Sequence, residues 1–409
     1  MSRAAQTTSS WGPSLAVLSV VTAIAVSTIY LPQPLLTDFI SQLGTTTAAA
    51  SGIATAVQLG YALGIFLLVP LADHFQPRAQ ISLQMLLLVA GLLVTAALPG
   101  VGSIAAGFFA VGFVANIAQL IIPTAAKIAP DDAKHSTTSA LVGSLLIGIF
   151  GGRIVAGLLG TLIGWRGVLV LFAVLVLLCL PLVRRVVPRQ MPVAERVAYH
   201  RILFATLHRL ATSGVLLESA IVQFFGFAAF NALWTVMVLH LTRVLHWTPA
   251  TAGLFGVVGL LAGVLTLVGA RTVQRLGSAR IVDISLVVLL AALLTVAFDA
   301  RLIWAFVPSV FVVTWANQLL QSANQGRVLL ANPAGAAQAN TMFMAAVFLG
   351  GSLGATLGPI AFERGGMGAV GVLGLALVGV AGVVRVIALL VERRRRGRRI
   401  PTTALEHGV

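Results

Sequence analysis

The side chains best able to do chemistry in this chain are the few polar and charged residues that interrupt its long apolar runs. Arg153 is the clearest of them, because it lies inside the apolar run 137–163, in the stretch "GIFGGRIVAG". A guanidinium keeps its charge and can bind an anion through several hydrogen bonds. In an apolar run it needs water or a partner. We expect Arg153 to face a wet cavity and take part in substrate binding or proton coupling; a structural pair or snorkelling is the alternative.

Neutral polar residues recur at spacings that place them on shared helix faces. Asn317, Gln321 and Asn324 stand at positions i, i+4 and i+7 of one run, and five other runs carry pairs of such residues. The pattern predicts either a shared polar cavity or separate interhelical hydrogen bonds, which contribute roughly 0.6 kcal/mol each. The paired residues are Tyr30 and Gln33, Gln58 and Tyr61, Asn116 and Gln119, Asn231 and Trp234, and Asn340 and Met344.

Two acidic residues are further candidates for proton coupling. Asp38 lies near the end of the run 14–40, and Glu218 lies less than two turns into the run 212–241. Ordinary positions at a helix end or at the water interface are favoured for both.

Catalytic and cofactor chemistry has no support in the sequence. There is no glycine-rich phosphate-binding loop that would imply ATP, and the seven histidines lack metal-ligand spacing. The lone Cys179 allows no disulfide framework. We therefore expect a non-enzyme without a metal or another cofactor, driven by a gradient or by the substrate itself.

The elements that must position these residues are membrane-spanning helices. The chain has 409 residues, of which 58% are hydrophobic and 9% charged, and its mean hydropathy is +1.01. Apolar runs long enough to cross a hydrocarbon core of roughly 30 Å recur throughout the sequence. Twelve all-helical spans are predicted, at 14–40, 48–72, 79–98, 102–127, 137–163, 167–188, 212–241, 249–273, 280–298, 302–326, 335–361 and 367–391.

The distribution of basic residues predicts the topology. Of 26 Lys and Arg residues, 21 fall on one side if the N-terminus is cytoplasmic, four fall outside, and Arg153 remains in the membrane. Arg327 and Arg385 are counted among the cytoplasmic residues. We expect a multi-pass protein of a bacterial inner membrane, with both termini cytoplasmic. The predicted parts are a six-helix bundle at 1–188, a linker at 189–211, a second bundle at 212–391 and a basic tail at 392–409.

The expected partners follow from the same pattern. A net charge of +15 could indicate nucleic acid, but the charges flank apolar spans, so attraction to anionic membrane lipids is favoured. A monomer is expected.

Two short loops at equivalent positions carry a recognisable pattern. "VPLADHFQPR" follows the second span of the first half, and "ARTVQRLGSAR" follows the second span of the other half. The first resembles the G-x-L-A-D-R-x-G-R-K loop of the major facilitator superfamily, with Asp73 at the acid and Arg78 at the last basic position. The resemblance implies a gating contact that forms and breaks during transport, involving Asp73, Arg78, Gln274 and Arg275. A solvated turn is the alternative.

Other stretches resemble the bacterial drug, sugar and metabolite exporters of the arabinose-efflux type within that superfamily. They include "QLGYALGIFLLVPLAD", "GWRGVLVLF" and "ANTMFMAAVFLGGSLGATLG". Exporters of this kind often carry G-x-x-x-G-P-x-x-G-G in the fifth helix, where this chain has Arg153 in place of the proline. The glycines of this stretch, Gly148, Gly152 and Gly157, serve either gating or helix packing. The family also arranges eight helices around the transport path, which favours a shared cavity for the polar residues above.

The resemblance implies a secondary transporter that rocks two bundles around a central site. Export of a small organic molecule in exchange for protons is the expected activity. One arginine and no deeply placed acid predict a neutral or anionic substrate rather than a lipophilic cation. A facilitator or a proton symporter for uptake is the alternative, and a membrane receptor or enzyme is a third possibility with less support.

Overall fold

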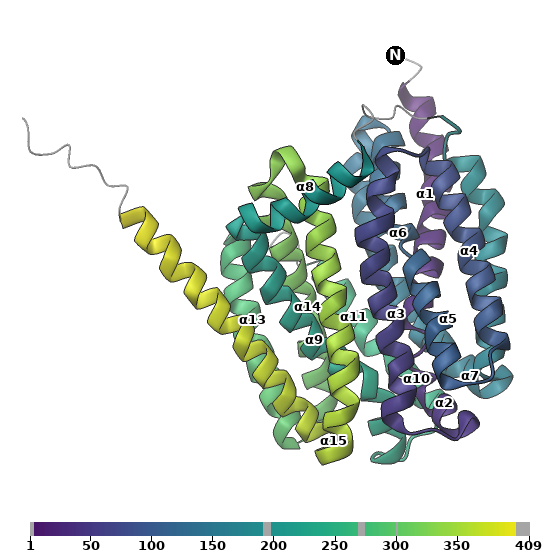
Figure 1. Cartoon of the computed structure of the whole chain (residues 1–409), viewed down its shortest axis with the longest axis vertical. Helices are drawn as coiled ribbons and strands as arrows, with labels where there is room; N and C mark the ends of the chain where they lie inside the picture. Colours follow the sequence, from purple (N-terminus) through teal and green to yellow (C-terminus); the bar gives the residue numbers. More distant parts are fainter. Residues whose placement is uncertain (1–3, 191–197, 269–274, 300–301, 398–409) are drawn as a thin grey trace, which may run out of the picture.

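The chain folds almost entirely into helices, as the computed structural model shows for residues 4–190, 198–268, 275–299 and 302–397 (Figure 1). A helix satisfies its backbone hydrogen bonds within one segment, which is the requirement that a hydrocarbon environment imposes. The first half contains α1 (Ala4–Ser27), η1 (Thr28–Tyr30), α2 (Leu36–Leu43), α3 (Thr47–Leu68), η2 (Val69–Asp73), α4 (Pro77–Ala97), α5 (Val101–Val114), α6 (Ile117–Ile128), η3 (Asp131–Ala133) and α7 (Lys134–Val186).

The second half follows a connecting helix, α8 (Tyr199–Thr212). It contains α9 (Gly214–Arg243), α10 (Pro249–Leu254), α11 (Gly256–Val268), α13 (Ser278–Asp299), α14 (Ile303–Ala331), η4 (Pro333–Gly335) and α15 (Ala336–Gly397).

Ten helices in the described ranges are long and apolar enough to cross a membrane. Two of them are far too long for one crossing, because α7 has 53 residues and α15 has 62, and a helix rises only about 1.5 Å per residue. Each turns back at a glycine in the left-handed region, Gly164 with φ 70° and Gly366 with φ 63°. The turn in α15 is plain in Figure 1. The fold therefore has the twelve crossings that the apolar runs predict.

Three predicted spans are divided into separate α-helices in the structure, and one of them, 249–273, becomes α10 and α11. The run 14–40 becomes α1, η1 and the short α2, and the first candidate membrane span ends at Tyr30. Pro32 and Pro34 follow that end, and proline lacks the N–H that would continue a helix. The run 102–127 is interrupted between α5 and α6, where Asn116 precedes the new helix.

The two halves meet mainly where α3 packs against α15 and where α7 packs against α10 and α11. At one end of the molecule lie α8 and the beginning of α1, and we call it the linker end (Figure 1). The far end is the one at which α2 lies. Helix α8 contacts both halves at the linker end: the Tyr199 hydroxyl donates to the Leu67 carbonyl at 2.6 Å, and α8 also packs against α9 and α15.

Candidate functional site

A cavity of about 550 Å³ lies between the two halves. Its wall extends to Val69, Thr138 and Leu329, which lie at the linker ends of their segments. The cavity therefore opens toward the linker end. Aromatic rings of Tyr30 and Phe230 lie among the residues at its inner part.

Six of the residues predicted from the sequence line this cavity: Tyr30, Tyr61, Gln119, Gln321, Asn340 and Met344. The structure adds amide, hydroxyl and aromatic side chains that the sequence pattern missed, namely Thr138, Phe227, Phe230, Thr266, Gln318, Ser322, Gln325, Thr341 and Phe348. Among the described residues that line it, none carries a charge. The cavity thus offers hydrogen-bonding groups and aromatic surface to an uncharged molecule.

The polar face of α14 lies about a quarter-turn from the predicted position. Gln318, Gln321 and Gln325 face the cavity, whereas Asn317 and Asn324 are fully buried. The Gln223 amide on α9 donates to Asn317 at 3.4 Å. Because residues advance by about 100° in a helix, the predicted stripe lies across the boundary between the cavity and the packed interface. A glutamine at each of positions 318, 321 and 325 was the signal that could have located the cavity face.

Arg153 lies behind the inner end of the cavity rather than in its wall. It is 3% exposed, and its guanidinium carbon lies 4.2 Å from the centroid of the Tyr30 ring and 5.0 Å from that of Trp234. Cation–π contacts of this kind stabilise a desolvated guanidinium. Arg153 instead lines a much smaller space of about 20 Å³ with Gln33 and Trp234, so Tyr30 separates its charge from the main cavity.

Hydrogen bonds extend from Arg153 across the interface between the halves. Its Nε donates to Gln33 Oε1 at 2.9 Å, and its Nη1 donates to the Ile149 carbonyl at 2.7 Å. Gln33 Nε2 donates to Asn231 Oδ1 at 2.8 Å, and Asn231 Nδ2 donates to the Gly351 carbonyl at 2.6 Å. Arg153 Nη2 is buried without a hydrogen-bond partner in the described part of the chain. Three predicted residues are thus joined in one network, which has one donor to spare.

Beyond this network the two halves are in direct contact at the far end. Gly157 and Gly253 approach so closely that a Cβ on Gly157 would lie 2.6 Å from the Gly253 Cα. Arg243 of the second half donates to Glu363 at 3.1 Å and to Thr47 of the first half at 3.4 Å. The hydroxyls of Thr55 and Thr356 are 3.0 Å apart. The structure is consequently closed at the far end and open at the linker end.

Two other predicted residues are buried away from the cavity wall. Asn116 is fully buried, and its amide donates to the Phe113 carbonyl at 2.7 Å. Both polar atoms of the Gln58 side chain are buried without a hydrogen-bond partner among the described residues.

The acidic candidates lie at opposite ends of the molecule. Asp38 is in the first turn of α2, beyond the first membrane span, and burial raises the pKa of its carboxyl. Glu218 is buried at the linker end of the second bundle and pairs with two arginines, at 2.8 Å from Arg327 Nη2 and 2.8 Å from Arg385 Nη1. Arg385 also pairs with Asp283 at 2.6 Å.

This ion-pair network explains how Arg385 is accommodated. The sequence assigns Arg385 to the cytoplasmic side, and the structure shows its side chain buried within the bundle, only 3% exposed. Glu218 and Asp283 supply the compensating charges, which is why an arginine is tolerated there. The sequence did not predict these pairs, because Asp283 and Glu218 lie more than 100 residues from Arg385 in the chain.

The predicted gating contact is only partly visible. Asp73 ends η2, but its side chain lies outside the described structure, and so does Gln274. Arg275 is exposed, and Arg78 lines a separate basic pocket with Arg184 and Arg189. The gating role of these residues stays a prediction.

Comparison with known proteins gives the family. The model of the Major Facilitator Superfamily matches residues 16–316. The "Uncharacterized transporter YgaY" of Escherichia coli O157:H7 is 31% identical over 360 residues, covering 88% of this chain and 91% of the relative. The "Probable transporter SCO4007" of Streptomyces coelicolor is 31% identical over 366 residues, covering 87% of this chain and 83% of the relative.

The solved structures agree on the fold. A crystal structure of the nucleoside transporter NupG, a D323A mutant, superposes with a TM-score of 0.74 at 14% identity, covering 92% of this chain and 98% of that one. Twelve crossings in two halves around a central cavity, and a family match over more than half of the sequence, lead to one conclusion: this chain belongs to the major facilitator superfamily.

Proposed function

We propose that this protein is a secondary active transporter that exports a small neutral or anionic organic molecule in exchange for protons. The family and its transporter relatives support transport of a small molecule. The observation that carries the finer proposal is the cavity between the halves, with an uncharged wall and a buried arginine behind its aromatic end.

The chemistry of the cavity wall supports the choice of substrate class. Gln119, Gln318, Gln321, Gln325 and Asn340 can each donate and accept hydrogen bonds, which suits hydroxyl and carbonyl groups. Tyr30, Tyr61 and Phe348 add aromatic surface for an apolar or planar part of the molecule. A cationic substrate would find no carboxylate among the described lining residues to offset its desolvation. A polyhydroxylated or partly aromatic molecule fits this wall best.

Arg153 is the residue we assign to coupling substrate binding with the opening of the far end. Its contacts with Gln33, and those of Gln33 with Asn231, join the two halves in the present state. A substrate acceptor that reaches past Tyr30 could take the free Nη2 donor and compete for the Gln33 contact. Transport would then require the Gln33–Asn231 hydrogen bond to break as the halves, 1–188 and 212–391, rotate about the linker at 189–211.

Proton coupling is assigned to Asp38 ahead of Glu218. Burial raises the Asp38 pKa, so this carboxyl exchanges its proton at a higher pH than an ordinary aspartate does. Glu218 is already engaged in ion pairs with Arg327 and Arg385 in the present state. The excess of Lys and Arg at the linker end supports our assignment of that end, with both termini, to the cytoplasmic side of a bacterial inner membrane.

The test is a transport assay in proteoliposomes with an imposed pH gradient. A metabolite panel is first screened for compounds that raise the melting temperature of the detergent-solubilised protein, and radiolabelled hits are then loaded into vesicles. We expect the substrate to leave the vesicles in the direction opposite to proton flow. This efflux should be abolished when a protonophore collapses the pH gradient. Efficient transport of quaternary ammonium dyes would overturn the substrate class. Accumulation together with protons would support the alternative, a symporter for uptake.

A further inference from the structure

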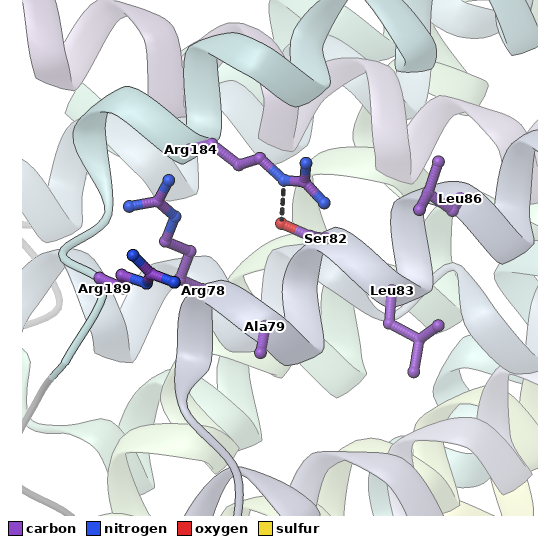
Figure 2. Close-up of a pocket in the computed structure, with 7 residues that line it drawn as sticks. All are labelled: Arg78, Ala79, Ser82, Leu83, Leu86, Arg184 and Arg189. Carbon is purple, nitrogen blue, oxygen red and sulfur yellow. Dashed lines mark hydrogen bonds between the residues drawn. The ribbon is translucent and has the colours of Figure 1, made fainter.

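A second pocket lies on the first bundle at the linker end, apart from the central cavity. It has a volume of about 460 Å³ and is lined by residues from the beginning of α4, the last turn of α7 and the segment that follows α7. Figure 2 shows these residues: Arg78, Ala79, Ser82, Leu83, Leu86, Arg184 and Arg189. None of them lines the central cavity, so the pocket is a separate feature of the molecule.

The pocket brings together three positive charges, and none of the described residues that line it is a carboxylate that could balance them. Arg184 Nε donates to the Ser82 hydroxyl at 3.2 Å, and this is a neutral partner. The ion pairs formed within the described residues all involve other basic side chains: Lys134, Arg243, Arg327 and Arg385. Guanidinium groups gathered in this way favour a ligand with an anionic oxygen, and phosphate matches their fork of N–H donors well.

The beginning of α4 strengthens this preference. Arg78 is the second residue of α4, where the helix dipole places partial positive charge. A cation in that turn is unfavourable on its own, whereas an anion there is stabilised by the helix dipole. The beginning of α4 and the three arginine side chains thus both favour a negatively charged ligand.

The apolar part of the pocket indicates what carries that charge. Leu83 and Leu86 lie on α4 one and two turns beyond Arg78, and they are 58% and 42% exposed. Both belong to the candidate membrane span Pro77–Ala97, so their exposed surface faces acyl chains. Figure 2 shows the leucines farther along α4 than the arginines. The pocket therefore passes from a basic head at the membrane surface to an apolar face within the membrane.

We propose that this pocket binds an anionic phospholipid, with its phosphodiester among Arg78, Arg184 and Arg189 and an acyl chain along Leu83 and Leu86. Basic pockets between membrane helices on the cytoplasmic side suit such headgroups. A bound lipid would join the beginning of α4 to the end of α7 and so stabilise the first bundle, independently of what the central cavity transports.

The test measures lipid binding by the full-length protein in detergent. Native mass spectrometry and melting temperatures are recorded with added phosphatidylglycerol, phosphatidylcholine or inorganic phosphate. The pocket variant is Arg78→Gln/Arg184→Gln/Arg189→Gln. The control Arg185→Gln/Arg201→Gln/Arg280→Gln removes the same charge from exposed arginines that do not line the pocket. A second variant, Leu83→Gln/Leu86→Gln, tests the apolar part.

We expect phosphatidylglycerol to bind and stabilise the parent protein, and phosphatidylcholine to do so much less. At about 1 kcal/mol for each arginine, the pocket variant should bind phosphatidylglycerol roughly 100-fold more weakly, with the control little changed. The leucine variant should weaken lipid binding and leave phosphate binding unchanged. Equal losses in the pocket and control variants would overturn the proposal. The proposal would also be overturned if inorganic phosphate bound the pocket as tightly as phosphatidylglycerol does, because the pocket would then be a site for a free anion. Melting without added lipid verifies that each variant is folded.

Discussion

The side chain of Gln33 donates a hydrogen bond of 2.8 Å to Asn231, and this contact joins the first six-helix bundle to the second. Gln33 also accepts from Arg153 at 2.9 Å, so the buried guanidinium holds the amide in the orientation that reaches Asn231. The buried charge of Arg153 thereby supports the interface between the two halves. The proposed transport mechanism requires this interface to open.

Replacing Arg153 should impair transport whether or not the new residue keeps the positive charge. Arg153→Gln removes the charge, and Arg153→Lys keeps it but loses the planar fork that reaches Gln33 and the Ile149 carbonyl together. We expect initial rates at least tenfold lower for both variants in proteoliposomes, with unchanged elution on size exclusion. Arg166→Gln, at an arginine outside the network, is the control. Full activity of Arg153→Lys would show that charge alone suffices.

Gly157→Ala should favour the state that is open at the far end. The added methyl group would lie 2.6 Å from the Gly253 Cα, so the two halves could not close there without a backbone shift. A cysteine at Val238, in a Cys179→Ser background, should then react with a membrane-impermeant maleimide several times faster than in the parent. Gly52→Ala is the matched control, because its methyl group meets nothing within 4 Å. Identical reaction rates would refute the closing role of this contact.

The neighbouring residues Gln318 and Asn317 should respond differently to alanine. Gln318 faces the cavity, so Gln318→Ala should raise the KM for the transported molecule several-fold and leave thermal stability unchanged. Asn317 is fully buried and accepts from Gln223, so Asn317→Ala should lower the melting temperature, because it leaves a buried amide unsatisfied. Transport kinetics and melting curves of both variants provide the comparison. The opposite pattern would mean that the cavity has been assigned to the wrong face of α14.

Glu218→Gln should destabilise the second bundle. The substitution leaves Arg327 and Arg385 with too little compensating charge in a buried site, and breaking such a pair costs about 3–5 kcal/mol. A melting temperature lower by several degrees in detergent is expected. Asp131→Asn breaks an exposed pair with Lys134 and should leave the melting temperature unchanged. If Glu218→Gln melts like the parent but loses proton-driven transport, Glu218 belongs to coupling instead.

Asp38→Asn should alter the pH dependence of transport. Burial raises the Asp38 pKa, so the carboxyl is protonated at low pH and loses its proton as the pH rises through that elevated value. In the asparagine variant this transition is absent, and we expect the rate of proton-driven transport to fall and to vary less between pH 4 and about 7. Rates measured across that range for parent and variant decide the matter; superimposable profiles would exclude Asp38 as the coupling residue.

The fold was predictable because a membrane imposes it. Apolar runs of sufficient length predicted the membrane crossings. The places where helices are interrupted coincide with residues such as Pro32 and Gly164. The candidate site was predictable only in part. Helix periodicity identified the polar side of α14 but not which neighbour it faces, since that depends on the rotation of the helix within the bundle. The ion pairs of Arg385 were missed for the same reason, because its partners come from other helices.

Helix α8 has a mechanical consequence. It is fastened to α3 through Tyr199 at its beginning and continues into α9 after Thr212. A rod of 14 residues, about 21 Å in length, therefore connects the two halves at the linker end, toward which the cavity opens. Because such a rod resists both stretching and compression, we expect it to act as a strut that fixes the widest aperture, so that α8 sets an upper limit on cargo size before any side chain in the cavity makes contact.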